Sequence, residues 1–203
     1  MSVSEHWDNA YASKGEAELS WFQEFPEHSL ALIRKHTADK TVGIIDVGGG
    51  AARLVDHLLE IGYSDVSVLD ISRVGMDQAK DRLGQAADRV NWIVVDITQW
   101  RPNRTWMIWH DRAVFHFLVD PTDQELYIEA LSAATRVGAT IIIATFALDG
   151  PDKCSGLPVQ RYSAKTLGMQ LGVGFRLLEQ AKETHLTPGG VQQHFSSAVF
   201  ERV

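Results

Sequence analysis

Three aspartates each end a short apolar run in this chain, at Asp46, Asp70 and Asp96. The first precedes the glycine cluster 48–50, and apolar residues then recur at helical spacing up to residue 59, which predicts a strand, a tight turn and a helix. Glycine lets the backbone bend and approach a ligand, and the free amides at the helix start face that ligand. A carboxylate before this turn repels a pyrophosphate and attracts a cation. The stretch 44–59 is therefore predicted to hold a ligand that carries positive charge.

The second acid, Asp70, ends the predicted strand 66–70 and lies twenty residues beyond Gly50. An acid at this spacing accepts both ribose hydroxyls in nucleoside-binding Rossmann-like folds. The alternative is a cap for the next helix, but Ser72 can fill that position. We therefore interpret Asp70 as a cofactor residue, with Ile71 against the base.

The most unusual stretch is WHDRAVFHFL at 109–118, which places His110, Asp111, Arg112 and His116 among large apolar side chains. Burying so many polar groups is costly unless they are paired or in use. We therefore predict the catalytic residues here. The alternative is an Asp111–Arg112 pair that fixes the loop, with His116 as a packing residue. A metal site is disfavoured, because the spacing fits no standard ligand motif.

The elements that position these residues alternate between strands and helices. Strands are predicted at 44–46, 66–70, 91–96, 105–110 and 139–146, which indicates an α/β fold with a parallel sheet. Thr122 and Glu125 form a predicted capping box for a helix to about residue 136. Two runs at 174–185 and 191–202, joined by the turn TPGG, predict a final hairpin. A dinucleotide-binding fold would continue with parallel strands instead, and it prefers a third glycine where this chain has Arg53.

The pattern Asp-x-Gly-x-Gly followed by a helix resembles motif I of the class I S-adenosylmethionine-dependent methyltransferases. The resemblance implies a Rossmann-like three-layer sandwich with a seven-stranded, mostly parallel sheet and an antiparallel last strand. It implies S-adenosylmethionine as cofactor, with acids meeting its ammonium group, ribose hydroxyls and adenine amine. The cofactor residues expected on this basis are Asp46, Gly48, Gly49, Gly50, Asp70, Ile71, Asp96, Ile97 and His110. From the residues alone, Asp96 is as readily a turn residue.

Two further segments resemble methyltransferase relatives and imply an acceptor pocket. The first 41 residues carry W-D-x-x-Y and S-W-aromatic-Q and are expected to form a helical cover, with a lid that closes over the site. The alternative is that its aromatic residues only pack on the sheet. The long loop 148–162 is expected to roof the pocket. Substrate residues expected from the two segments are Tyr11, Trp21, Gln23, Arg161 and Tyr162.

Length and charge limit the class of protein. With 203 residues, we expect one methyltransferase domain over 1–203, with the helical cover at 1–41 and the Rossmann-like core at 42–203. A net charge of −7 without a basic run argues against nucleic acid as partner. The chain shows neither a signal peptide nor an apolar run that spans a bilayer, so we expect a cytoplasmic protein. Its oligomeric state is not indicated.

The reaction expected from the resemblance is methyl transfer to a nitrogen, oxygen or sulfur nucleophile of a small molecule. Because the donor is already electrophilic, the protein mainly orients the reactants and excludes water. A protein-lysine methyltransferase, a dehydrogenase and a non-catalytic S-adenosylmethionine-binding protein remain as alternatives. The lysine methyltransferase would differ in its acceptor, the dehydrogenase would bind a nicotinamide cofactor, and the binding protein would show no turnover.

Overall fold

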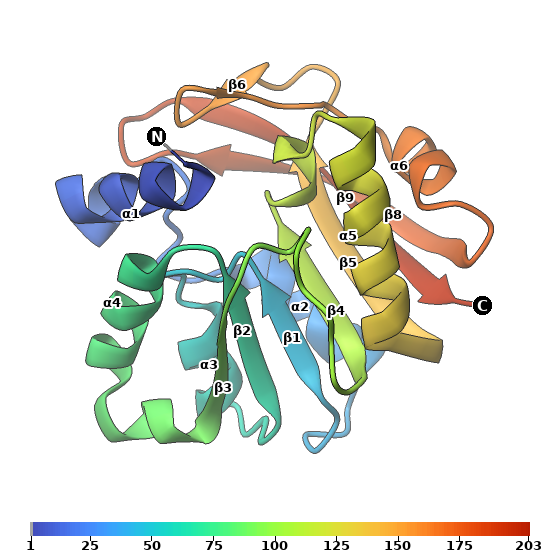
Figure 1. Cartoon of the computed structure of the whole chain (residues 1–203), viewed down its shortest axis with the longest axis horizontal. Coiled ribbons are helices and arrows are strands. Elements are labelled where there is room, and N and C mark those ends of the chain that lie inside the picture. Colours follow the sequence, from blue (N-terminus) through green and yellow to red (C-terminus); the bar gives the residue numbers. More distant parts are fainter. Residues whose placement is uncertain (1) are drawn as a thin grey trace.

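Strand β1 (Ile44–Val47) lies inside a seven-stranded sheet of order β3-β2-β1-β4-β5-β9-β8 in the computed structural model, which describes residues 2–203 (Figure 1). The other strands of the sheet are β2 (Val66–Asp70), β3 (Val90–Val94), β4 (Trp106–Arg112), β5 (Thr135–Phe146), β8 (Phe175–Leu186) and β9 (Gln192–Arg202). Strands β1 to β5 pair in parallel, whereas β9 is antiparallel to both β5 and β8. The predicted mostly parallel sheet and final hairpin are confirmed.

Helices cover both faces of the sheet. On one face, α2 (Glu27–His36), α3 (Leu54–Glu60) and α4 (Arg73–Leu83) share an apolar core with β1 and β4 through Ile44 and Ile108. On the other face, α5 (Pro121–Ala134) and α6 (Ala164–Leu171) pack on Ile45 and Trp109. Successive side chains of a strand point to opposite faces, so neighbouring residues of β1 and β4 enter different cores. The result is the three-layer sandwich expected from the sequence.

The start of the chain lies across the carboxyl ends of the strands. It comprises α1 (Val3–Ser13) and a 3-10 turn at Glu16–Glu18, and α1 packs beside α4 (Figure 1). We call residues 2–25 the lid. Two more 3-10 turns, Gly84–Arg89 and Phe115–Phe117, follow α4 and β4.

Some predicted bounds differ from the structure, since α5 ends at Ala134 rather than near residue 136 and β5 begins at Thr135 rather than at residue 139. Helix α5 begins at Pro121, and its cap is Asp120, whose carboxylate accepts a hydrogen bond from the Thr122 backbone at 2.8 Å. The predicted capping box of Thr122 and Glu125 was wrong, because an aspartate followed by proline at the first helical position already starts the helix. The predicted loop 148–162 contains a small hairpin of β6 (Lys153–Cys154) and β7 (Leu157–Pro158).

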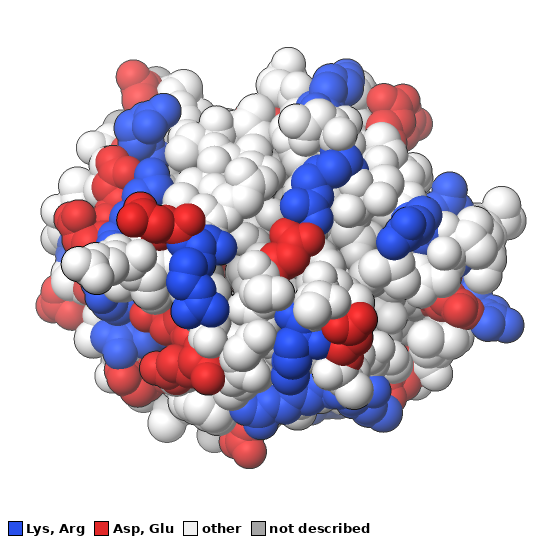
Figure 2. All heavy atoms as spheres, turned by 90° about the horizontal axis from the view of Figure 1, so that it is seen from below, with Lys and Arg blue, Asp and Glu red and all other residues white. Residues whose placement is uncertain are grey.

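The surface in Figure 2 carries both signs of charge. Lysine and arginine side chains lie beside aspartate and glutamate over this face rather than collecting in a region of one sign. Within residues 2–203, no helix has the length and apolar character needed to cross a membrane.

Candidate active site

A cavity lies beneath the lid, above the carboxyl ends of β1, β2 and β4. Its lining combines acids, the glycine turn and aromatic residues, and includes Trp7, Tyr11, Trp21, Gln23, Asp46, Gly48, Gly49, Asp70, Ile71, Ile97, His110, Arg112, Phe117 and Cys154. Carboxyl ends of parallel strands are where open α/β sheets bind ligands. The lining therefore brings together residues predicted from three separate stretches of the sequence.

Asp46 and His110 form a buried pair on neighbouring strands. Oδ1 of Asp46 lies 2.7 Å from Nδ1 of His110, and Nε2 of His110 lies 2.9 Å from the Ser29 hydroxyl of α2. All three side chains are buried and line the cavity. Because a carboxylate can only accept, Nδ1–H donates to Asp46, and Nε2 shares a hydrogen bond with the Ser29 hydroxyl. Both nitrogens of His110 are thus already bonded.

The glycine turn has no room for side chains. A Cβ on Gly48, where φ is +73°, would lie 2.0 Å from a methyl group of Val114, and a Cβ on Gly50, where φ is +42°, would lie 2.1 Å from the Tyr11 hydroxyl. Positive φ also disfavours any other residue at both positions. Val114 and Tyr11 therefore pack directly on the backbone of this turn, whose Gly48 and Gly49 line the cavity, whereas Gly50 does not.

Asp70 lies at the cavity wall, where β2 ends. Its carboxylate accepts a hydrogen bond from the Ser72 backbone at 2.7 Å, while the Ser72 hydroxyl caps α4 by accepting from Gly75 at 3.1 Å. Burial raises the pKa of Asp70 to about 7, and the nearby charges of Asp46 and Asp8 add to the increase. Ser72 therefore supplies the helix cap, and Asp70 lines the cavity.

Asp96 is bonded within its own turn. Oδ1 accepts from the backbone and the hydroxyl of Thr98, at 2.9 and 2.8 Å. Val95 and Ile97 line the cavity, but the side chain of Asp96 does not. This geometry favours the turn role, and an adenine contact remains a proposal.

The polar cluster of 109–118 is divided between the two faces of β4. Asp111 accepts from the backbone of Val114 and Phe115 and from the Tyr127 hydroxyl at 2.6 Å. Burial raises the pKa of Asp111 to about 6. Asp111 lies outside the cavity lining. It therefore fixes the loop that follows β4, which carries Val114 to the glycine turn.

Arg112 lines the cavity and forms an ion pair with a residue of β8, which lies far along the chain. Its Nη2 lies 3.6 Å from Oε1 of Glu183 in β8, and its guanidinium carbon lies 4.4 Å from the centre of the Phe195 ring. The alternative of an Asp111–Arg112 pair was wrong, because consecutive residues of a strand face opposite sides.

His116 does not reach the cavity. Its Nδ1 accepts from the backbone of Phe146 at 3.2 Å, and burial, followed by the charge of Arg112, lowers the pKa of His116 to about 3. Within residues 2–203, no group of three or more His, Cys, Asp or Glu residues is placed to hold a metal ion. We therefore assign His116 no part in the reaction proposed below.

The lid contributes aromatic and polar groups to the cavity. The Trp7 ring meets Phe117 edge to face at 5.0 Å and Trp21 at 5.7 Å. Tyr11 lies on the glycine turn, and Nε2 of Gln23 donates to Glu183 at 2.9 Å. The lid thus touches both the glycine turn and the pair formed by Arg112.

The two residues expected from loop 148–162 lie elsewhere. Arg161 is exposed and donates to the carbonyl of Gly150, and the buried Tyr162 accepts from Gln124 at 3.2 Å. Neither residue lines the cavity. The backbone amide of Tyr162 donates to the carbonyl of Phe146, and the Tyr162 ring packs in the core against Phe115.

Two residues that bond to predicted site residues escaped sequence reasoning. Ser29 and Glu183 bond to His110 and Arg112 across the fold, and only the tertiary pairing reveals them. Cys154 lines the cavity, and burial raises the pKa of its thiol to about 11. The sequence of loop 148–162 indicated that this segment lies over the pocket, but it did not indicate a role for the thiol.

The residues present fit S-adenosylmethionine, the cofactor implied by the resemblance. Asp46 and Asp70 offer buried acceptors, and the glycine turn offers backbone without side chains. Ile71 and Ile97 add apolar walls for a flat base. Donor and acceptor chemistry therefore matches a ligand with a cation, ribose hydroxyls and an aromatic base.

Comparisons with known proteins agree with this geometry. A family model described as a methyltransferase domain matches residues 44–138. The mouse eEF1A lysine and N-terminal methyltransferase is 24% identical over 123 residues, which cover 60% of this chain and 17% of that protein. The chain thus spans about one sixth of the length of this curated relative.

Solved structures extend the likeness to nearly the whole chain. A protein from a study of the conversion of a disulfide bond into a thioacetal group during echinomycin biosynthesis has a TM-score of 0.78 and 18% identity, covering 99% of this chain and 92% of that one. Burkholderia thailandensis 1,6-didemethyltoxoflavin-N1-methyltransferase, solved with 1,6-didemethyltoxoflavin and S-adenosylhomocysteine, has a TM-score of 0.70 and 16% identity, covering 99% and 85%. At these identities the structures show a shared fold. Residues 44–138 thus match a methyltransferase domain, and the chain as a whole has the fold of class I S-adenosylmethionine-dependent methyltransferases.

Proposed function

We propose that this chain transfers the methyl group of S-adenosylmethionine to a nitrogen, oxygen or sulfur atom of a small molecule. The observation that carries the proposal is one cavity that joins the acids of β1 and β2 to an aromatic compartment under the lid. Asp46 and the glycine turn would hold the amino-acid end of the cofactor, and Asp70 the ribose. Ile71 and Ile97, with Asp96 beside them, would surround the adenine.

The acceptor would lie beside Arg112, Phe117 and the lid residues Trp7, Trp21 and Gln23. When bound, the cofactor supplies an electrophilic methyl group on a sulfonium. The aromatic walls exclude water and orient the acceptor, and Arg112 with Glu183 fixes its polar end. Because both nitrogens of His110 are bonded within the protein, orientation rather than a protein base is proposed to drive the transfer.

A second candidate is methylation of a protein. The likeness to the eEF1A lysine and N-terminal methyltransferase favours it over part of the chain. The roof formed by Trp7 and Trp21 over the cavity supports the smaller acceptor, because a side chain of a folded protein needs an open approach.

The test uses S-adenosylmethionine labelled in its methyl group, incubated with the protein and a cell extract divided into molecules below and above about 1 kDa. Label in the small fraction, lost in Asp70→Ala, supports the proposal. Label only in the protein fraction supports the second candidate. Tight S-adenosylhomocysteine binding without transfer to either fraction would show a non-catalytic binding protein.

A further inference from the structure

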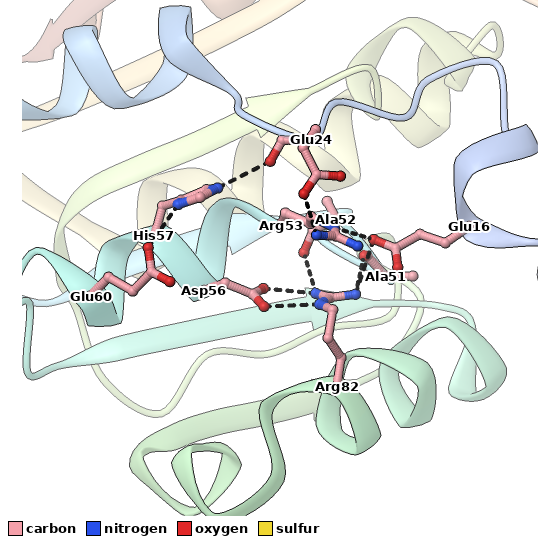
Figure 3. Close-up of polar contacts among 9 residues, drawn as sticks. All are labelled: Glu16, Glu24, Ala51, Ala52, Arg53, Asp56, His57, Glu60 and Arg82. Atoms are coloured by element: carbon pink, nitrogen blue, oxygen red, sulfur yellow. Dashed lines mark hydrogen bonds and ion pairs between the residues drawn. The ribbon is translucent and has the colours of Figure 1, made fainter. Parts of the chain in front are cut away.

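Arg82, in the last turn of α4, joins the glycine turn to the lid. Its Nε and Nη2 bond to the two carboxylate oxygens of Asp56 in α3, at 2.8 and 2.7 Å. Nη1 donates to the carbonyl of Ala51 at 2.9 Å, and Nη2 to that of Ala52 at 3.1 Å. Nη1 also donates to Glu16 of the lid at 3.2 Å. A guanidinium has five N–H donors, and these contacts use all of them (Figure 3).

The two carbonyls belong to the turn that leads from the glycines into α3. This helix begins without a side-chain cap, since the side chain of Arg53 makes no capping bond at its N-terminus. The amide of Ala52 donates to Gly49 at 2.7 Å, so the peptide planes that Arg82 holds are continuous with the glycine turn. Arg82 therefore sets the orientation of a backbone segment whose residues Ala51 and Ala52 line the cavity, although Arg82 itself does not.

The lid reaches the same cluster through Glu16. One oxygen of its carboxylate accepts from Nε of Arg53 at 2.9 Å and from Nη1 of Arg82 (Figure 3). The side chains of Glu16 and Arg82 are only 24% and 18% exposed, so solvent screens this contact less than an open surface pair. Glu24 adds a bond to Arg53, but it is 71% exposed and is expected to contribute little.

We propose that Arg82 is a positioning residue that couples lid closure to the cofactor turn, with Glu16 as the group on the lid that it holds. The inference rests on the proposed cofactor site. While Glu16 is bound, the lid stays over the cavity and the carbonyls of Ala51 and Ala52 stay fixed. Release of a cofactor requires the lid to open, which breaks the Glu16 contact.

The experiment compares Glu16→Gln and Arg82→Lys with wild type. The binding of S-adenosylhomocysteine is followed by tryptophan fluorescence, since Trp7 and Trp21 line the cavity. Glu16→Gln leaves the contacts of Arg82 to Asp56 and the carbonyls in place, so we expect the dissociation rate to rise about tenfold with little change in association. Arg82→Lys keeps the positive charge but loses the planar guanidinium that bonds both oxygens of Asp56 and the two carbonyls. We therefore expect the dissociation constant for S-adenosylhomocysteine to rise tenfold or more.

Two matched controls remove a charge without touching the lid contact. Lys80→Gln changes the same helix α4, where Lys80 contacts Asp77, and Glu18→Gln changes the same lid turn. Both are expected to bind and release S-adenosylhomocysteine as wild type does. Wild-type kinetics in Glu16→Gln and Arg82→Lys would overturn the inference.

A second measurement needs no ligand and separates this inference from the proposed function. Hydrogen exchange of the ligand-free protein is expected to rise in residues 2–25 for Glu16→Gln, and in both 2–25 and 48–53 for Arg82→Lys. Unchanged exchange in both variants would overturn the coupling, whether or not the cofactor binds. Failure of wild type to bind S-adenosylhomocysteine would instead contradict the proposed function, and the exchange data would still decide the coupling.

Discussion

Asp46 and His110 lie directly opposite each other on β1 and β4, and their side chains meet at 2.7 Å under the cavity. The Ser29 hydroxyl of α2 contacts the far nitrogen of the ring. A buried carboxylate is costly unless it is hydrogen-bonded, and His110 supplies that bond. His110 therefore supports the acid expected to meet the cofactor's ammonium group.

We expect Asp46→Asn to weaken cofactor binding while preserving the fold. The amide oxygen can still accept from His110, but the negative charge that attracts an ammonium group is lost. Since a hydrogen bond to a charged group contributes roughly 1.5–3 kcal/mol, the dissociation constant for S-adenosylhomocysteine should rise about tenfold to hundredfold. Isothermal titration calorimetry measures this change.

Ser29→Ala is the matched control, because it removes the bond to Nε2 and leaves the charge of Asp46 in place. Its affinity should stay within a few-fold of wild type. An Asp46→Asn variant that binds as tightly as wild type would remove Asp46 from the cofactor site.

The raised pKa of Asp70 predicts a dependence of stability on pH. An unfolded aspartate has a pKa of about 3.9, whereas the buried carboxyl titrates at about 7. Between these values the folded protein binds a proton that the unfolded chain does not. The contribution of Asp70 to the free energy of unfolding of the ligand-free protein should therefore fall as pH rises from about 4 to 7, whereas His116, with its lowered pKa, contributes the opposite slope. Urea denaturation of wild type and Asp70→Asn across this range isolates the contribution of Asp70 as the difference between them.

Asp70→Asn should flatten the upper part of that slope. Asp111→Asn serves as comparison, because the pKa of Asp111 is raised only to about 6 and its contribution ends at lower pH. A wild-type slope between pH 6 and 7 in Asp70→Asn would show that this carboxyl is already ionised in the folded protein.

Much of the fold was readable from local pattern. The strand 66–70 follows from its apolar run, and Ser72 was expected to be able to cap the next helix; the structure has both features. The start of α5 was misread because Asp120-Pro121 and Thr122-x-x-Glu125 are both start signals, and only one can be used.

The side-chain partners at the site were harder to predict. Asp111 and Arg112 are adjacent in sequence, but their partners Tyr127 and Glu183 come from α5 and β8. Which face of β4 each side chain occupies depends on register, and a shift of one residue would exchange them. Local sequence therefore indicated that the cluster was polar and buried without indicating what each group binds.

The contact between Tyr127 and Asp111 gives the last prediction. In Tyr127→Phe the ring remains, but Asp111 loses a 2.6 Å hydrogen bond and the Trp109 indole loses its acceptor at 2.9 Å. Both groups are fully buried, so we expect a loss of about 2–4 kcal/mol in the free energy of unfolding, measured by urea denaturation. Tyr162→Phe is the control, because it also removes only a hydroxyl. That hydroxyl accepts a single 3.2 Å hydrogen bond from Gln124, and Gln124 keeps its 2.7 Å bond to the Leu118 carbonyl. That variant should lose less than about 1 kcal/mol. Equal losses in the two variants would mean that the Asp111 carboxylate does not depend on Tyr127, and the loop that carries Val114 to the glycine turn would need another anchor.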